Sequence, residues 1–107
     1  MQGETLKGHL DMLLLAALEA KPAHGYAVVE TLRQKSGGTL DLPEGTLYPA
    51  LHRLEDAGLV TSQWSESGGR RRRVYQLTAK GRHSLARKQT EWRAFAQAVN
   101  GVVEGIA

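Results

Sequence analysis

Cysteine is absent from this chain of 107 residues. Its absence excludes disulfides, thiolate catalysis and cysteine-based zinc fingers, and it is typical of a protein that works in a reducing cytoplasm. Apolar runs are short, and none approaches the roughly 18 residues that a membrane-spanning helix needs. Glu4 and Asp11 interrupt the apolar region that a secretory signal peptide would require. We therefore expect a cytoplasmic protein with no membrane contact.

The motifs of common enzymes are also lacking. No serine lies in a Gly-x-Ser-x-Gly turn, and no glycine-rich loop with a lysine is present to cradle phosphate. No pair of carboxylates is placed together by its spacing. We expect no enzymatic activity and no required cofactor.

Charge is unevenly distributed along the chain, whose formal net charge is +3. Residues 1–66 hold five Lys or Arg against nine Asp or Glu, whereas residues 67–107 hold nine against two. An excess of cations concentrated in one part of a small protein is typical of a nucleic-acid-binding face. The alternative is a basic surface that is merely solvated.

Apolar residues at helical spacing predict two helices in the first third of the chain. The first is expected over residues 5–20, with Thr5 as its cap. Pro22 and Gly25 interrupt the pattern. The second is expected over residues 25–35, with Val29 and Leu32 at the centre of its buried face. Residues 39–42 form a short extended connection and are a candidate for a minor strand.

A third helix is predicted to begin near Thr46, a good capping residue, and to end at Gly58. Pro49 is then harmless because it falls in the first turn, where amide hydrogens have no partner within the helix. The buried face comprises Leu47, Leu51 and Leu54. The outward side chains are those of Thr46, Pro49, His52, Arg53 and Asp56, with Tyr48 at the edge.

Two β-like runs follow, at residues 60–66 and 74–77, and between them lie Ser67-Gly68-Gly69 and four arginines, Arg70, Arg71, Arg72 and Arg73. Glycine supplies the positive φ angles that a tight hairpin turn needs. Guanidinium groups stay charged and bind phosphate in a forked geometry. The segment therefore predicts a hairpin whose tip carries cations for a polyanion. Arg73 shares the strand parity of Tyr75 and is the arginine least suited to face DNA.

Thr78 is expected to cap a last helix that begins at Ala79. Apolar residues recur along it every seven positions, at Leu85, Trp92, Val99 and Ile106, and Phe95 and Val102 fill the seam between them. A domain this small has too little core of its own to bury so many large side chains, so the pattern predicts a homodimer. The dimer seam would comprise Leu85, Trp92, Phe95, Val99 and Val102. The alternative is a helix that folds back on the first helix within one subunit.

Several stretches resemble the PadR family of bacterial transcriptional regulators. They are His24-Gly25-Tyr26, residues 44–55 with their Gly-Thr-Leu-Tyr-Pro segment, Gly58-Leu59-Val60, and residues 75–81. The short tail is similar to the subfamily that has a single C-terminal dimerisation helix. The resemblance implies a dimeric winged-helix repressor that acts on promoter DNA, often its own. It also implies release by a small apolar or aromatic effector near the dimer interface.

The candidate DNA-binding residues are Tyr26, Thr46, Tyr48, Pro49, His52, Arg53, Arg70, Arg71, Arg72 and Arg73. The third helix would read the major groove, and the arginines would hold the backbone or the minor groove. Alternatives remain for each side chain. Arg53 would either read guanine or form an ion pair with Glu55 or Asp56. His52 would contact DNA or be solvated, and Tyr48 would contact phosphate or sugar or pack half-buried.

The candidate effector contacts are Trp92 and Phe95, with Leu14 or Leu18 completing an apolar slot. The alternative for Trp92 is simple packing in a core or interface. Metal binding has weak support: His9 and His83 could converge with a carboxylate, and His52 has helical spacing to Glu55 and Asp56. A metal ion is therefore not expected as a cofactor.

These patterns together predict a mainly α fold with a small β-hairpin, namely a winged helix-turn-helix plus a long C-terminal helix. Residues 1–78 would form the DNA-binding domain and residues 79–107 the dimerisation helix. The expected function is a sequence-specific transcriptional repressor that an effector releases, with its own promoter among the candidate targets. The alternatives are a winged-helix module that binds an acidic protein and a metal-responsive regulator.

Overall fold

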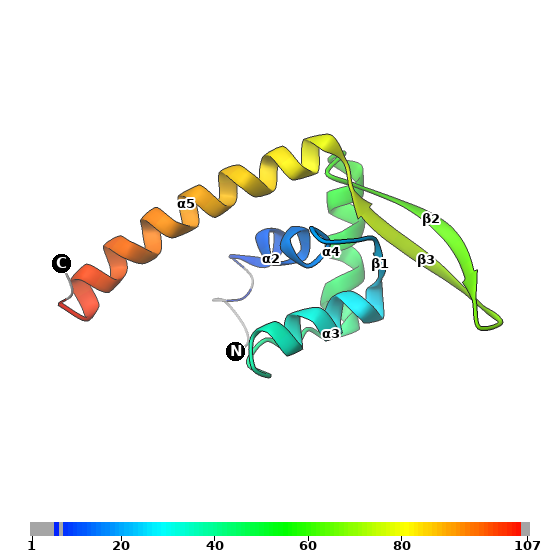
Figure 1. The fold of residues 1–107 in the computed structure, drawn as a ribbon, viewed down its shortest axis with the longest axis horizontal. Coiled ribbons are helices and arrows are strands. Elements are labelled where there is room, and N and C mark those ends of the chain that lie inside the picture. The colour runs from blue at the N-terminus through cyan, green and yellow to red at the C-terminus, as the bar shows by residue number, and fades with distance from the viewer. Residues whose placement is uncertain (1–5, 7, 106–107) are drawn as a thin grey trace.

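The computed structural model describes residue 6 and residues 8–105. Its elements in chain order are α2 (Leu10–Ala17), β1 (Ala23–His24), α3 (Gly25–Lys35), α4 (Glu44–Asp56), β2 (Val60–Ser67), β3 (Arg70–Leu77) and α5 (Ala79–Val103). The helices gather at the centre, the β2–β3 hairpin projects from one end and α5 extends toward the other (Figure 1). This is the mainly helical winged fold with a long last helix that the sequence predicts. No helix in the described part of the chain is long and apolar enough to span a membrane.

Leucines dominate the core. Those whose side chains are almost completely buried come from α2 and the residue after it, α4 and α5: Leu14, Leu15, Leu18, Leu47, Leu51, Leu54 and Leu85. Burial of one such side chain contributes about 1.5–3 kcal/mol. The expected buried face of the third helix is therefore confirmed. Leu85 corrects the predicted dimer seam, because it is 1% exposed and packs in the core of its own subunit.

The second helix has the predicted bounds, but the first and third do not. The first is the short α2, which follows a turn at Gly8 and His9, and Thr5 lies outside the described residues. α4 begins two residues before Thr46, and its N-cap is Pro43, which makes no side-chain capping bond. Thr46 is thus not the cap. Pro49 lies inside the helix rather than in its first turn.

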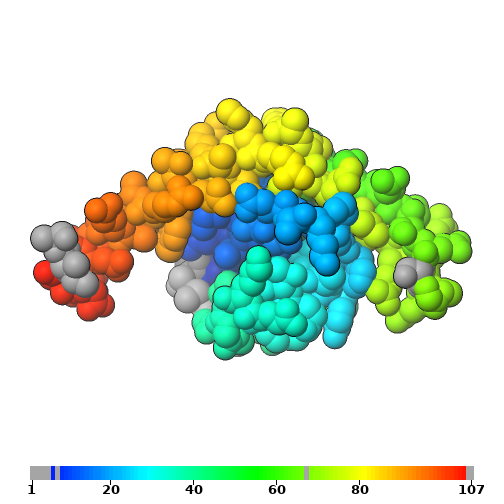
Figure 2. All heavy atoms as spheres, in the orientation of Figure 1, coloured from blue at the N-terminus to red at the C-terminus, as the bar shows by residue number. Residues whose placement is uncertain are grey.

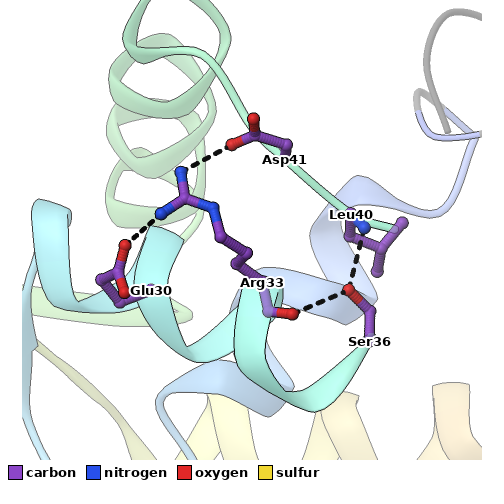
Figure 3. A network of polar contacts seen from close by, with 5 residues as sticks. All are labelled: Glu30, Arg33, Ser36, Leu40 and Asp41. Atoms are coloured by element: carbon purple, nitrogen blue, oxygen red, sulfur yellow. Dashed lines mark hydrogen bonds and ion pairs between the residues drawn. The ribbon is translucent and has the colours of Figure 1, made fainter. Parts of the chain in front are cut away.

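A network of polar contacts holds the loop between α3 and α4 (Figure 3). Arg33 pairs with Glu30 on its own helix and with Asp41 in the loop, the latter at 2.8 Å. The hydrogen bond from Arg33 to Asp41 raises the pKa of Arg33 above its ordinary value. Ser36 Oγ accepts from the amide of Leu40 at 2.8 Å. These contacts fix the approach to α4 and so its orientation against α3.

The sheet is antiparallel with the strand order β1-β3-β2. The minor strand is formed by Ala23 and His24, paired with Tyr75 and Val74, and not by residues 39–42 as expected. Gly68 and Gly69 form the hairpin turn with φ angles of 58° and 76°, as the two-residue turn requires. β3 begins directly after this turn, so the four arginines belong to a strand instead of a loop at the tip.

α5 is a helix of 25 residues. Thr78 caps it as predicted, since the Thr78 hydroxyl accepts from the amide of Gly81 at 3.0 Å. Its first turns pack on α2 and β3, and the remainder projects away from the helical body (Figure 2). Along this projecting part Phe95, Val102 and Val103 are 57%, 86% and 69% exposed. Ile106 lies outside the described residues.

Candidate nucleic-acid interface

The outward face of α4 carries Gly45, Pro49, His52 and Asp56, which are all exposed. They lie opposite the buried leucines because residues three, four and seven apart share one side of a helix. His52 Nε2 is 3.4 Å from a carboxylate oxygen of Asp56. Glycine and proline occupy two positions of this face and carry no long side chain. Thr46 is also exposed, on one flank.

Tyr48 lies on the other flank of α4 and packs on the first residue of α3. A Cβ atom added to Gly25 would lie 2.6 Å from the hydroxyl oxygen of Tyr48 and 2.8 Å from its ring. Glycine is therefore required for this close approach. The arrangement places a phenol hydroxyl against a helix N-terminus, where free amide hydrogens and the helix dipole favour an anion.

His24 and Tyr26 flank the same helix N-terminus. The two rings stack with their centroids 6.4 Å apart, and Tyr26 is 66% exposed. His24 is the N-cap of α3 and its Nδ1 accepts from the amide of Ala27 at 3.3 Å. Arg72 Nη1 lies 2.8 Å from the other ring nitrogen. A neutral imidazole accepts at only one nitrogen, so these two donors compete.

Burial lowers the pKa of His24 below its ordinary value, and the nearby positive charge of Arg72 lowers it further. His24 is therefore neutral at physiological pH. Protonation would turn both ring nitrogens into donors, remove the cap of α3 and repel Arg72.

The β2–β3 hairpin, which we call the wing, carries its arginines on both faces. Side chains alternate along β3, so Arg71 and Arg73 share a face with Trp64, and Arg70 and Arg72 lie on the other. Arg70 and Arg71 are exposed, whereas Arg72 and Arg73 are half-buried. The expectation that Arg73 is the arginine least suited to face DNA stays a prediction, because Arg72 is half-buried as well.

A cleft of about 570 Å³ lies between the wing and the starts of α3 and α4. Its lining includes the side chains of all four arginines together with His24, Tyr26, Glu44, Tyr48, Trp64 and Tyr75. Burial raises the pKa of Tyr75 above its ordinary value, so its hydroxyl stays neutral. The cleft joins aromatic surfaces, a helix N-terminus and fixed cations, which is a combination suited to a sugar-phosphate backbone.

Arg53 lies on the flank of α4 that faces away from this cleft. It pairs with Asp11 of α2. Arg53 therefore forms an ion pair, as one sequence alternative stated, but its partner is Asp11 and not Glu55 or Asp56. Glu55 instead accepts from the hydroxyl of Ser62 at 2.7 Å.

A second hollow, of about 370 Å³, lies beside Trp92 between α2, α4 and α5. Phe95, Arg53 and Asp11 also line it, and the rings of His9 and Trp92 meet edge to face with centroids 5.1 Å apart. Leu14 and Leu18 are 0% and 1% exposed and belong to the core. They do not complete an apolar slot at Trp92, in contrast to the sequence expectation.

The described residues hold no group of three or more His, Asp or Glu side chains arranged to bind a metal ion. His83 is exposed on α5, and His9 packs on Trp92. The weak metal candidates His9 and His83 therefore do not form a site with a carboxylate in that part of the chain, nor does His52 with Glu55 and Asp56.

Sequence reasoning did not assign five residues of the cleft, which are His24, Gly25, Glu44, Trp64 and Tyr75. Trp64 could have been found, because a two-residue turn at Gly68 and Gly69 places it directly opposite Arg73. Gly25 gave no such signal, since its role depends on where α4 crosses α3.

Comparison with known proteins agrees with this geometry. The model of the transcriptional regulator PadR-like family matches residues 14–87. A transcriptional regulator from Clostridium thermocellum superposes with a TM-score of 0.86 at 29% identity, over 94% of this chain and 99% of that one. A PadR family transcription regulator from Clostridium difficile R20291 gives a TM-score of 0.79 at 35% identity, over 90% and 99% of the two chains.

Bacillus subtilis PadR in complex with operator DNA shares the fold. Its TM-score is 0.68 at 23% identity, over 75% of this chain and 46% of that one. Because the family model covers well over half of the sequence, from within α2 to the first turns of α5, this chain belongs to the PadR-like family of transcriptional regulators, a family of regulators and not of enzymes.

Proposed function

We propose that this chain is a cytoplasmic, homodimeric repressor that binds promoter DNA through the cleft between the wing, α3 and α4. The observation that carries the proposal is the convergence of four arginines, Tyr48 and the N-terminus of α3 on one cleft. Arginines on a strand hairpin hold the backbone, while the exposed outward face of α4 is available to base edges in the major groove. That the B. subtilis PadR of the same fold is known in complex with operator DNA supports this use of the scaffold.

Dimerisation is proposed through the projecting part of α5. Trp92, Phe95, Val99 and Val102 are 42%, 57%, 37% and 86% exposed on one side of that helix. A contiguous apolar stripe on a soluble protein marks an interaction surface. A two-fold pairing along it gives each operator half-site one recognition helix. The division of the chain at residue 78 stays a prediction, since the first turns of α5 share the core of the winged helix.

Release by a small effector is proposed at the hollow beside Trp92. Its indole and Phe95 offer apolar faces, with ring centroids 6.2 Å apart. The hollow also touches Arg53 on α4, so a bound molecule there contacts the recognition helix directly. An effector acts by changing the spacing of the two recognition helices in the dimer.

The test is fluorescence anisotropy of labelled DNA from the region upstream of the chain's own gene, beside a random duplex, at two salt concentrations. We expect preference for the upstream DNA, one dimer per site, and a steep loss of affinity with salt. Equal and salt-sensitive binding to both duplexes would contradict autoregulation but not DNA binding. Absence of binding to either would contradict the proposal and favour a module that binds an acidic protein through the wing.

A further inference from the structure

Hydrogen bonds connect α4, the proposed recognition helix, to the wing. Ser62 on β2 donates to Glu55 of α4 at 2.7 Å. The same hydroxyl accepts from Nε of Arg73 on β3 at 2.8 Å. Glu55, Ser62 and Arg73 are each half-buried. A charge-assisted bond at each end makes this a firm connection between an α4 carboxylate and a guanidinium of the wing.

Trp64 continues the connection toward the tip of the wing. It is paired in register with Arg73, whose guanidinium carbon lies 5.3 Å from the centroid of the indole ring. The guanidinium of Arg71 lies over the same ring at 4.6 Å. Guanidinium groups are attracted to the face of an indole, and stacking on it restricts their rotamers. One indole thus holds two arginines in place.

Arg71 and Arg73 nevertheless differ in what they can reach. The side chain of Arg73 is half-buried, and its Nε is already occupied by Ser62. Arg71 is exposed, and its guanidinium, which lies over Trp64, makes no hydrogen bond or ion pair among the described residues. Arg71 therefore presents its hydrogen-bond donors outward, whereas Arg73 faces inward to α4.

We propose that these two arginines have different functions. Arg71 contacts a DNA phosphate. Arg73 is a positioning residue that, with Ser62 and Trp64, fixes the angle between the wing and the recognition helix. This inference rests on the proposed function, because it names which wing cations meet DNA and which set the geometry of the interface.

The salt dependence of DNA binding separates the two functions. Each phosphate neutralised by the protein contributes about 0.9 to the slope of log affinity against log salt concentration. A dimer has two wings, so Arg71→Gln should lower the slope by about 2. Arg73→Gln should weaken binding roughly tenfold and leave the slope unchanged, since it removes no phosphate contact. Ser62→Ala should reproduce the Arg73→Gln effect.

Trp64 supplies the conservative control. Trp64→Phe keeps an aromatic face under both guanidinium groups and should bind DNA nearly as wild type does. Trp64→Leu keeps an apolar side chain but removes the aromatic face. It should lose DNA affinity as Arg73→Gln does, while the slope of log affinity against log salt concentration stays that of the wild type. Circular dichroism and thermal unfolding of each variant show that the fold is retained.

A measurement on the DNA-free protein tests the positioning contacts by themselves. The chain has two tryptophans, so in a Trp92→Phe background the fluorescence comes from Trp64 alone. Quenching by acrylamide should rise when Arg73→Gln or Ser62→Ala is added, because the guanidinium of residue 73 is then no longer held over the indole. Unchanged quenching in both would overturn the positioning role, whatever the DNA result.

The outcomes are distinct. A slope lowered by about 2 in Arg71→Gln but not in Arg73→Gln supports the assignment. An equal fall in both variants shows that Arg73 also meets phosphate and overturns it, and so does wild-type affinity in Arg73→Gln. Wild-type protein that binds no DNA contradicts the proposed function itself, while the quenching result still reports on the contacts within the wing.

Discussion

Gly25→Ala is the substitution that most sharply separates stability from DNA binding. The new Cβ would lie 2.6 Å from the hydroxyl oxygen of Tyr48 and 2.8 Å from the ring, whereas ordinary contacts begin at 3.4 Å. The phenol is the far end of an exposed side chain, so it is displaced by about 1 Å or rotates away. Alanine has a higher helix propensity than glycine by up to about 1 kcal/mol. The thermal midpoint should therefore stay the same or rise.

DNA binding should fall in the same variant. A displaced Tyr48 would lose the hydrogen bond to phosphate that we propose for its hydroxyl, and a bond to a charged group contributes about 1.5–3 kcal/mol. That corresponds to a loss of roughly tenfold to a hundredfold in affinity. Tyr48→Phe is the matched control, since it removes only the hydroxyl. Anisotropy titrations of wild type, both single variants and the double variant complete a thermodynamic cycle.

The cycle decides whether one contact underlies both effects. If Gly25→Ala acts by displacing the hydroxyl, the double variant should bind little worse than either single variant. Additive losses would refute that reasoning, and so would wild-type affinity in Gly25→Ala. A large drop in thermal midpoint would show that the ring cannot move away and that the helix pair is disrupted instead.

Three further predictions follow from the structure. Leu85→Ala should lower the free energy of unfolding by about 2–5 kcal/mol in urea melts, whereas Val102→Ala, on the exposed stripe, should raise the dimer dissociation constant measured by sedimentation equilibrium. His24 has a lowered pKa in the folded state, so its contribution to stability should be complete above pH 6.5. That contribution should be lost as pH falls from there through the folded-state pKa, and stability should be flatter with pH in His24→Asn. Asp11→Asn should cost less than about 1 kcal/mol of stability and should tighten operator binding by freeing Arg53; unchanged affinity would show that Arg53 does not reach DNA.

Local patterns predicted much of the fold because they depend on neighbours along the chain. The bounds of α3, the Thr78 cap and the Gly68–Gly69 turn are each set by residues within a few positions. The predicted start of α4 was wrong because the prediction relied on Thr46 as a good capping residue type. The N-cap is instead Pro43, whose fixed φ suits that position. The extra strand was misplaced because two residues, Ala23 and His24, carry no strand pattern of their own.

The site was predicted in its residue types but not in its contacts. Tyr26, Tyr48 and the arginines were expected to bind DNA, and they line one cleft. The pairing of Arg53 with Asp11 joins residues 42 apart, which spacing along one helix cannot indicate. The same holds for Leu85: its heptad spacing fits a dimer seam, but this part of α5 lies over α2 and is covered by its own subunit.

Hydrogen–deuterium exchange of the protein with and without its operator tests the central claim most directly. DNA should slow amide exchange in three segments that are distant in sequence: residues 24–27, 45–52 and 64–73. The apolar stripe of α5 should be protected equally in both states, because the dimer forms without DNA. Protection by DNA that is confined to α5, or that spares the wing, would contradict the account.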